Sequence, residues 1–346
     1  MRAATTEEPG YRPPDVGGAG PAAAVLGGAE FARLTDPFRP ELLAYCYRML
    51  GSVHDAEDQL QETLIRAWRS YGQFEGRSSL RTWLYRIATN SCLRALENRR
   101  RRPLPAGLGG PADPDGPLDP AAAEVPWLEP FPDVLLDAEL TDPAAIVTSR
   151  QDLRLALIAA LQYLPGRQRS VLILRDVLMW RAAEVAELLG ISTVAVNSVL
   201  QRARAGLREA GPVRDEMREP ADVGQRALVD QYAAAIENAD VTALMRLLRA
   251  DATFEMPPVP AWFLGREQIG RFLVSYVLRE PGDLRTVRTS ANGQPALAVY
   301  QRDRDGLHRA HVVQVLTCTA AGVARVVAFR DPGLFAAFGL PPELPA

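Results

Sequence analysis

Residues 104–148 separate two parts of the chain that each have a helical pattern of their own. This segment is rich in proline, glycine and alanine, and it contains nine acidic residues but no arginine or lysine. Proline and glycine interrupt helices, and a segment with so few large apolar side chains cannot bury a core of its own. We therefore predict a flexible acidic linker between two all-α domains at residues 29–103 and 149–211.

A short run inside this linker carries two aromatic residues. Trp127 and Phe131 lie within residues 125–132, among several prolines. An exposed tryptophan is unusual in a linker, so the run predicts a docking site, with the C-terminal part of the chain as one candidate surface. The alternative is a bare spacer, since linkers also contain isolated aromatic residues.

Helical periodicity is strongest in residues 55–102. Apolar residues recur at helical spacing in a first helix, which Asp55 can cap and which is acidic near its start, and in a second helix over residues 80–99. Aromatic residues alternate with arginines in this region. Rings beside guanidinium groups can stack unpaired bases and hold their phosphates. The alternative is that the rings belong to the core and the arginines are merely solvated.

These residues resemble region 2 of the sigma-70 family, in its extracytoplasmic-function group. The matching runs are Asp55-Ala56-Glu57-Asp58, Gln61-Glu62-Thr63, Ala67-Trp68, Arg81-Thr82-Trp83-Leu84 and Ile87-Ala88-Thr89-Asn90. The resemblance implies that the first helix binds the clamp of core RNA polymerase and that the aromatic and arginine residues open and read the minus-ten promoter element. The polymerase-binding residues would be Asp55, Glu57, Asp58, Gln61 and Glu62. The minus-ten residues would be Tyr71, Phe74, Arg77, Arg81, Trp83, Arg86 and Asn90.

Residues 182–208 have the spacing of a helix-turn-helix. Ala186 is small where two helices would cross, Gly190 relaxes the turn, and Val196 and Val199 would bury the second helix. Ser192 is expected to cap that helix, whose outward side chains can contact base edges and phosphates. The predicted DNA-contacting residues are Arg181, Thr193, Asn197, Ser198, Gln201, Arg202 and Arg204, with Arg167, Arg169 and Arg208 as further phosphate contacts.

Two runs in this unit resemble sigma region 4. They are Leu164-Pro165-Gly166-Arg167-Gln168-Arg169 and Gln201-Arg202-Ala203-Arg204. The resemblance implies that the unit reads the minus-thirty-five promoter element and contacts the polymerase flap, while the linker runs toward the active-site channel of the polymerase. Asn197 and Val199 stand where many relatives have basic residues, so the preferred DNA sequence is not implied.

The chain changes character at residues 224–340. Helical patterns at 227–237, 241–248 and 266–278 precede strand patterns at 297–302, 311–317 and 323–329, which predicts an α+β domain. With Tyr232, Asp240 and Gly265-Arg266, this order resembles the SnoaL-like group of the nuclear-transport-factor-two-like fold, whose sheet curls around a cone-shaped pocket. The candidate pocket residues are Tyr232, Met256, Trp262, Phe263, Tyr276, Tyr300, His311 and Gln314.

Enzymes of that fold use a pocket Asp or His as a base. His311 lies beside Val312 and Val313 in a strand, where a hydrogen-bonded core histidine is more common than a catalyst, and no carboxylate is placed beside it by the sequence. We therefore predict no catalytic residue. A small-molecule sensing pocket and a packing or regulatory domain both stay open. The resemblance to sigma factors with fused SnoaL-like domains favours regulation in cis, through contact with the first helical domain or the linker.

Composition excludes several other classes of protein. The three cysteines are far apart and none has metal-site spacing, so we expect no disulfide framework, no metal site and no cofactor. Residues 1–28 lack the basic start and apolar core of a signal peptide, and no apolar run is long enough to span a membrane. We expect a flexible tail at residues 1–28 and a cytoplasmic protein.

The combined prediction is a sigma factor that binds core RNA polymerase and directs promoter recognition, DNA melting and transcription initiation. The main alternative is a ligand-responsive DNA-binding regulator that never engages polymerase, but such a protein would have no use for the acidic helix and the aromatic surface beside it. A third class, an isomerase with DNA-binding appendages, would need a substrate-dependent activity that the sequence does not specify.

Overall fold

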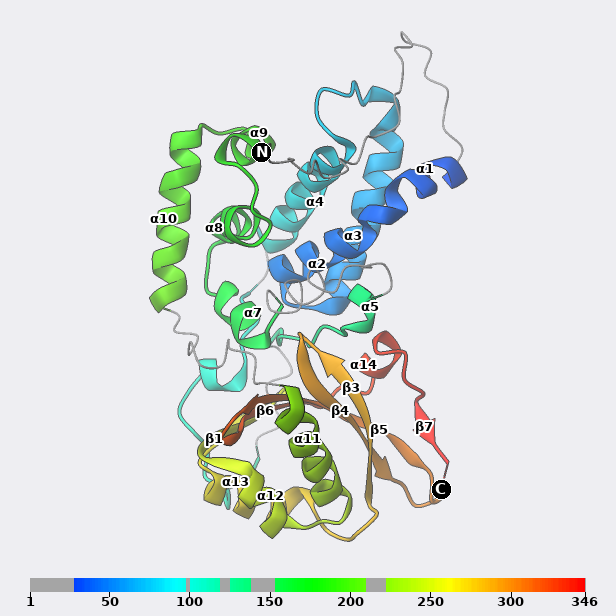
Figure 1. The fold of residues 1–346 in the computed structure, drawn as a ribbon, viewed down its shortest axis with the longest axis vertical. Helices are drawn as coiled ribbons and strands as arrows, with labels where there is room; N and C mark the ends of the chain where they lie inside the picture. Colours follow the sequence, from blue (N-terminus) through cyan, green and yellow to red (C-terminus); the bar gives the residue numbers. More distant parts are fainter. Residues whose placement is uncertain (1–27, 98–99, 119–124, 138–152, 210–221, 346) are drawn as a thin grey trace, which may run out of the picture.

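The chain forms a helical half and a sheet half (Figure 1). In the computed structural model, residues 28–97, 100–118, 125–137, 153–209 and 222–345 are described. The helical half holds two units that lie side by side, and the sheet half lies beneath both of them. Residues from the segment between the two helical units lie at the junction of the halves.

The first helical unit differs from its prediction at one helix start. Its first two helices are separated by a short 3-10 turn that contains Pro37. The next helix is capped by Ser52, whose Oγ accepts a hydrogen bond from the Asp55 amide at 3.1 Å, so the prediction of Asp55 as the cap is wrong. The elements are α1 (Gly28–Thr35), η1 (Asp36–Phe38), α2 (Arg39–Leu50), α3 (Val53–Ser70), η2 (Tyr71–Gln73) and α4 (Leu80–Glu97).

The second helical unit confirms the predicted helix-turn-helix. Gly190 has a φ of 65°, which suits glycine, and the Ser192 hydroxyl caps the second helix by accepting from the Ala195 amide. Val196 and Val199 are buried as predicted. The elements are α7 (Leu155–Leu161), α8 (Gly166–Leu172), the π-helix η4 (Ile173–Val177), α9 (Ala182–Leu189) and α10 (Thr193–Glu209).

The C-terminal domain is α+β, as predicted. Its strands follow the order β2-β1-β6-β5-β4-β3, with β1 and β6 parallel, the other pairs antiparallel, and β7 paired with β5. The helices are α11 (Asp222–Glu237), α12 (Val241–Leu247), α13 (Arg266–Phe272), η6 (Leu273–Val277) and α14 (Leu334–Ala337). The strands are β1 (Leu248–Met256), β2 (Val259–Leu264), β3 (Leu284–Ala291), β4 (Gln294–Arg302), β5 (His308–Thr319), β6 (Gly322–Phe329) and β7 (Glu343–Leu344).

The two faces of the sheet belong to different cores. On β4, Leu297 and Val299 belong to a core closed by α11, α12 and α13, whereas Ala298 and Tyr300 belong to a core that continues into both helical units. Side chains of a strand alternate between the faces, so one sheet serves both cores. The curled sheet with helices over one face is the arrangement that the SnoaL-like resemblance implies.

The described parts of the segment between the helical units are packed, not bare spacer. Leu104, Leu128 and Phe131 are at most 4% exposed. Two short helical pieces, η3 (Pro105–Gly107) and α5 (Val134–Asp137), lie within it. The segment has no core of its own, as predicted, but the prediction of a flexible linker is wrong for residues 104–105 and 128–133, which pack against other elements. Its side chains fill space left between other elements, which a count of apolar residues in the segment itself cannot reveal.

Candidate nucleic-acid interface

The predicted minus-ten residues gather where η2 meets the start of α4. Tyr71, Phe74 and Trp83 form a ring cluster with centroid distances of 5.0–6.2 Å. The three rings are half-buried, so each keeps an exposed part beside the core. Arg77 and Asn90 are exposed, with Arg77 paired to Glu75. The cluster therefore combines both readings of the sequence, because its rings pack on the core and also face solvent.

Two arginines of this set are engaged by other parts of the protein. Arg81 donates to both carboxylate oxygens of Glu41, at 2.7–3.0 Å, and lies 5.2 and 5.5 Å from the rings of Tyr85 and Trp180. Trp180 belongs to the second helical unit. Arg86 pairs with Glu187, on α9 of that unit, at 3.3 Å. Residues expected to meet DNA thus join the two helical units to each other.

The predicted polymerase-binding residues of α3 divide into two groups. Glu57, Asp58 and Gln61 are exposed, whereas Glu62 pairs with Arg66 along the helix. Asp55 accepts a hydrogen bond from Arg102 at 2.5 Å, and both side chains are only about 15% exposed. The exposed group can reach a partner protein as it stands, but Asp55 cannot do so without leaving Arg102.

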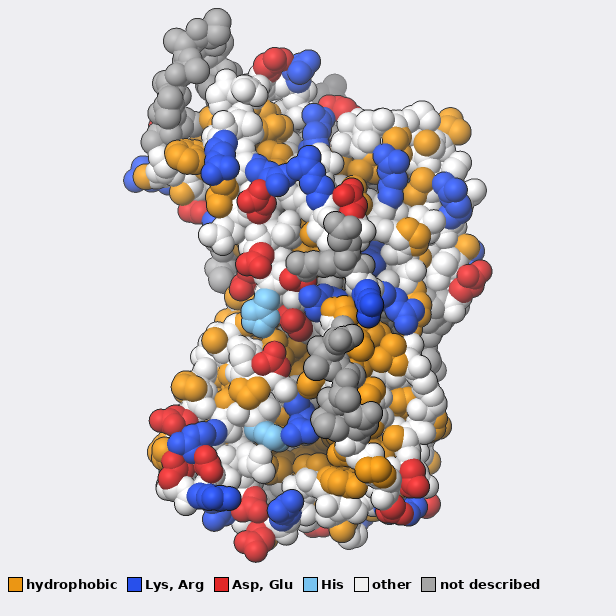
Figure 2. Space-filling view, turned by 180° about the vertical axis from the view of Figure 1, so that it is seen from behind, with side chains coloured by type: hydrophobic (Ala, Val, Ile, Leu, Met, Phe, Trp, Pro, Cys, Tyr) orange, Lys and Arg blue, Asp and Glu red, His pale blue; other side chains and the backbone are white. Residues whose placement is uncertain are grey.

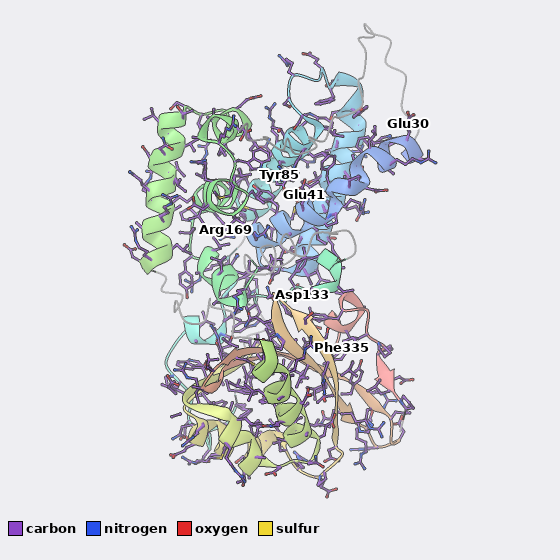
Figure 3. All side chains as sticks on the ribbon, in the orientation of Figure 1. Glu30, Glu41, Tyr85, Asp133, Arg169 and Phe335 are labelled. Atoms are coloured by element: carbon purple, nitrogen blue, oxygen red, sulfur yellow. The ribbon has the colours of Figure 1, made fainter. Side chains whose placement is uncertain are left out.

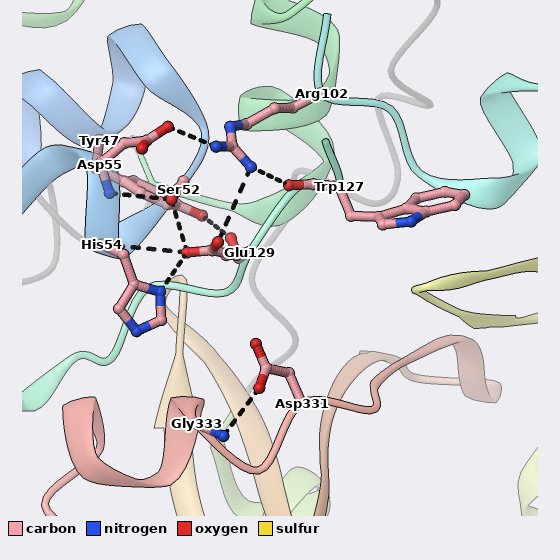
Figure 4. A network of polar contacts seen from close by, with 9 residues as sticks. All are labelled: Tyr47, Ser52, His54, Asp55, Arg102, Trp127, Glu129, Asp331 and Gly333. Carbon is pink, nitrogen blue, oxygen red and sulfur yellow. Dashed lines mark hydrogen bonds and ion pairs between the residues drawn. The ribbon is translucent and has the colours of Figure 1, made fainter. Parts of the chain in front are cut away.

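Arg102 and Asp55 belong to a network that fixes the aromatic run of the linker (Figure 4). Arg102 also donates to the Trp127 carbonyl at 2.7 Å. The Glu129 carboxylate accepts from the Ser52 hydroxyl at 2.8 Å and contacts the His54 ring at 3.0 Å. Sequence reasoning placed Trp127 in a docking run. The structure docks that run on the first helical unit and, through Phe131 and Pro132, on the C-terminal domain.

The recognition helix α10 presents its predicted residues to solvent. Thr193, Asn197, Ser198, Gln201 and Arg202 are exposed along one side, opposite the buried valines. Two basic residues of the set have acidic neighbours. Arg204 pairs with Asp176 at 2.7 Å, and the Arg181 amide donates to the Glu184 carboxylate at 2.6 Å. Figure 2 shows arginine side chains spread over the helical half of the molecule, interspersed with acidic ones.

Arg169 is not a phosphate contact, contrary to the prediction. It is 4% exposed and points into the helical half (Figure 3). Its guanidinium donates to the Gln162 side chain at 2.7 Å, to the Gln162 and Leu164 carbonyls at 3.1 Å, and to the Met49 carbonyl of α2. Burial lowers the pKa of Arg169 to about 10. Its partners are backbone groups brought together by packing, so the sequence carried no signal for this role.

The turn between β3 and β4 joins the C-terminal domain to three other segments. The Asn292 side chain, which is fully buried, accepts from the Phe131 amide at 2.9 Å and donates to the Tyr47 hydroxyl at 2.9 Å and the Leu153 carbonyl at 2.7 Å.

The neighbours of Asn292 extend this junction. The Gly293 amide donates to the Asp133 carboxylate, and the Leu155 amide donates to the Gln294 side chain. Asp133 lies between the two halves in Figure 3. We call residues 292–294 the junction turn. It contacts α2, the linker and the start of the second helical unit at once.

Four of the eight predicted pocket residues line a cavity on the helix-covered face of the sheet, namely Met256, Tyr276, His311 and Gln314. Tyr232 lies behind that cavity, where its hydroxyl donates to Gln314 at 3.1 Å. Tyr300 packs on Phe335 at the opposite face, because it is one residue out of phase with Val299 and Gln301, which line the cavity. Trp262 lies on the edge strand β2 and donates to the Gly109 carbonyl. The pocket prediction is wrong for Tyr300 and Trp262.

Three further features concern the cysteines, metal-binding groups and membrane-spanning helices. The three cysteines are buried and free. Among the described residues, no group of three or more His, Cys, Asp or Glu side chains could hold a metal ion. No single helix in the described ranges is long and apolar enough to cross a membrane. Helices α9 and α10 pass that test only as a pair, and they meet at a bend of 100°.

The comparisons with known proteins agree with this architecture. Residues 34–102 match the family described as Sigma-70 region 2, and residues 154–207 match Sigma-70, region 4. The chain is 52% identical over 318 residues to the ECF RNA polymerase sigma factor SigG of Mycobacterium tuberculosis (strain H37Rv), which covers 91% of this chain and 85% of that protein.

Two further relatives extend the comparison. SigW of Bacillus subtilis (strain 168), another ECF RNA polymerase sigma factor, is 30% identical over 179 residues, covering 52% of this chain and 87% of SigW. The crystal structure of the extracytoplasmic function sigma factor SigJ of Mycobacterium tuberculosis aligns with a TM-score of 0.60 and 23% identity. That alignment covers 90% of this chain and all of SigJ, so the two proteins share a fold across the helical units and the C-terminal domain.

Proposed function

Because the chain belongs to the extracytoplasmic-function group of RNA polymerase sigma factors, we propose that its C-terminal domain regulates promoter recognition in cis by holding the two helical units together. The chain directs RNA polymerase to promoters and takes part in transcription initiation. The alternative of a DNA-binding regulator that never engages polymerase loses its basis, since the similarity includes the whole of region 2.

The proposal assigns three surfaces to the two partners. The exposed acidic side of α3, with Glu57, Asp58 and Gln61, binds the polymerase clamp. The half-buried ring cluster of Tyr71, Phe74 and Trp83, with the neighbouring arginines, stacks and holds the minus-ten element, since rings beside guanidinium groups suit unpaired bases. The outward side of α10 reads the minus-thirty-five element from the major groove.

One observation carries the regulatory part of the proposal: side chains needed for binding are engaged in contacts between the helical units. Arg81 lies against Trp180, and Arg86 is paired with Glu187. A guanidinium in these positions cannot hold a phosphate in the same geometry. Binding of single-stranded DNA by Arg81 and Arg86 therefore competes with the closed arrangement of the two units.

The junction turn fastens the closed arrangement from the C-terminal domain. Asn292 bonds to the first helical unit through Tyr47, to the linker through Phe131 and to the second unit through Leu153. Removing the Asn292 side chain would leave the buried Phe131 amide and the buried Leu153 carbonyl without this partner, which costs about 1–3 kcal/mol. A difference of that size shifts an equilibrium between closed and open forms by roughly 5–150-fold.

The test is in vitro transcription with purified core RNA polymerase, on promoters selected from a random library. The full chain is compared with Asn292→Ala and with a matched control, Asn238→Ala, whose exposed side chain bonds only within its own helix region. We expect promoter-specific transcripts from the unaltered chain and a rise of roughly 5-fold or more with Asn292→Ala at limiting protein. The control should match the unaltered chain.

Two results would contradict the proposal in different ways. If no form of the chain directs initiation, the sigma role itself fails. If all forms initiate but Asn292→Ala transcribes equally or less at equal folded concentration, the C-terminal domain does not restrain the helical units. Circular dichroism and unfolding midpoints establish the folded concentration of each variant.

A further inference from the structure

The C-terminal domain encloses a cavity of about 290 Å³ between the sheet and the helix α13 with its continuation η6. Most of its lining residues are apolar or aromatic, with Phe254, Met256 and Phe272 among them. This volume lies at the lower end of the range for small-molecule sites in proteins. The cavity is on the face of the sheet that turns away from the helical units, so it is separate from the candidate DNA and polymerase surfaces.

The polar side chains of the cavity are neutral or positive. Gln301, His311, Gln314 and Arg330 line it, and none of the described lining residues is acidic. Burial and the nearby Arg330 lower the pKa of His311 to about 4, so the imidazole is neutral near pH 7 and has one N–H to donate. Gln314 is held from behind by the Tyr232 hydroxyl.

These features favour binding over catalysis. A histidine with so low a pKa is a weak base, and no lining carboxylate replaces it. An arginine next to a neutral N–H donor, in an otherwise apolar wall, complements a carboxylate at one end of an apolar molecule, because a guanidinium forms its strongest hydrogen bonds with an anion.

The linker between the helical units covers this cavity. Leu118 is one of its lining residues. The Ala112 amide donates to the Trp262 carbonyl at 2.7 Å, and the Tyr276 hydroxyl donates to the Gly116 carbonyl at 2.9 Å. Asp115 pairs with Arg271 of α13. These contacts are few, and those made by Asp115 and Tyr276 lie at exposed positions, so the cover can move without disrupting the core.

We propose that this cavity binds a small, largely apolar carboxylate, with its anionic end at His311 and Arg330, and that residues 109–118 of the linker form its cover. The ligand would meet Leu118 directly and so change the position or order of the cover. Its effect on transcription rests on the regulation proposed above, because the same linker is held further along by Asn292 through Phe131. Binding itself does not depend on that regulation.

The binding test uses decanoate as the apolar carboxylate and decan-1-ol as the matched neutral molecule. The full chain contains only three histidines, so ¹⁵N-histidine labelling gives few signals, and His311→Gln assigns one of them. We expect decanoate to shift the His311 signal and to raise the pKa of His311, because an adjacent negative charge favours the imidazolium. His54 and His308 should not respond.

Two arginine variants distinguish a site specific for a carboxylate from a cavity that binds any apolar molecule. Arg330→Gln should weaken decanoate binding about 10-fold or more and change decan-1-ol binding little, since only the acid uses the guanidinium. Arg246→Gln, an exposed arginine on α12 that does not line the cavity, should change neither. The proposal is overturned if decanoate leaves His311 unmoved, or if acid and alcohol bind alike with no effect of Arg330→Gln.

Hydrogen exchange of the full chain tests the cover. Saturating decanoate should change exchange across residues 109–118, including the Ala112 amide, and Tyr276→Phe should speed decanoate binding by loosening the cover at Gly116. Unchanged exchange at saturation would remove residues 109–118 from the site. These measurements need no polymerase, so a failure of ligand binding and a failure of the proposed transcription function are observed separately.

Discussion

Buried polar side chains connect segments of this protein that are far apart in sequence. Arg169 joins α8 to α2, and Asn292 joins the C-terminal domain to both helical units. Each of them contacts backbone groups that packing has removed from water. Removing such a side chain leaves those groups unsatisfied, which costs more than the hydrogen bond itself contributes.

Arg169→Met is expected to destabilise the helical half by about 2–4 kcal/mol, because the carbonyls of Met49, Gln162 and Leu164 lose a buried donor. Urea unfolding followed by circular dichroism measures this change. Arg167→Met is the matched control, since Arg167 is exposed on the same helix, and its effect should stay within about 0.5 kcal/mol. Equal effects of the two substitutions would show that the Arg169 contacts contribute little.

His311 gives the folded protein a pH-dependent stability. Its pKa is about 4 in the folded state and 6.5 in its usual range, so the unfolded chain binds the proton more readily between these values. The contribution of neutral His311 to the free energy of unfolding is therefore fully present above pH 6.5 and is lost as the pH falls toward 4. Between pH 7 and pH 5 the loss amounts to roughly 2 kcal/mol.

His311→Gln should remove this part of the pH dependence. The measurement is the free energy of unfolding from urea titrations at pH 5, 6 and 7, for the variant and the unaltered chain. We expect the stability difference between the two proteins to change by roughly 2 kcal/mol across this range. A constant difference would mean that His311 titrates normally in the folded state.

Among the elements, α10 presents two kinds of exposed polar side chain. Asn197 and Gln201 are exposed amides suited to adenine, and Arg202 is an exposed cation suited to phosphate. Both kinds project from a helix that Val196 and Val199 anchor by burial. Local cap and turn geometry thus determines which side chains of α10 face outward.

Substitutions on α10 should therefore have two distinguishable effects on promoter binding. Arg202→Ala is expected to weaken binding to all sequences. It should also reduce the slope of the logarithm of the binding constant against the logarithm of salt concentration by about one. Asn197→Ala should relax the preference at one base pair, by about 1–3 kcal/mol, with little change in salt dependence. Binding of the full chain with core polymerase to a library of minus-thirty-five sequences, at several salt concentrations, measures both. Identical profiles for the two variants would contradict this division.

In the molecule as a whole, the sheet lies between two cores. One face belongs to the core of the helical units and the other lines the cavity, while the linker contacts both. The helical units also share an apolar core, in which the ring centroids of Tyr85 and Trp180 lie 5.1 Å apart, and surface pairs such as Arg86 with Glu187 contribute little singly. The buried junction turn adds hydrogen bonds to both units.

A covalent lock between the helical units should abolish transcription. Cysteines placed at Arg86 and Glu187 can be joined by a cleavable bismaleimide, since these side chains meet at 3.3 Å and the three native cysteines are buried. We expect the cross-linked chain to lose promoter-specific transcripts with core polymerase and to regain them after reductive cleavage of the bismaleimide cross-link. Chains with one added cysteine, treated in the same way, are the controls. Full activity of the joined chain would show that the units need not separate.

Features that depend on neighbours along the chain were predictable from the sequence alone. The helix-turn-helix follows from Ala186, Gly190 and Ser192 at fixed spacing, and the exposed acidic side of α3 follows from helical periodicity. Helix caps, tight turns and one-sided burial depend on residues a few positions apart, so a linear pattern specifies them. The α+β character of the C-terminal domain was predicted in the same way from β4, β5 and β6.

Which surfaces meet could be known only from the folded structure. β1, β2 and β3 were missed because their strand pairing depends on partners elsewhere in the sheet, and the pocket prediction failed at Tyr300 because the face a residue occupies depends on register. The burial of Arg169 and the docking of Phe131 onto Asn292 arise from packing between segments more than a hundred residues apart. Such contacts form where the folded backbone brings polar groups out of water, and no local pattern encodes that position.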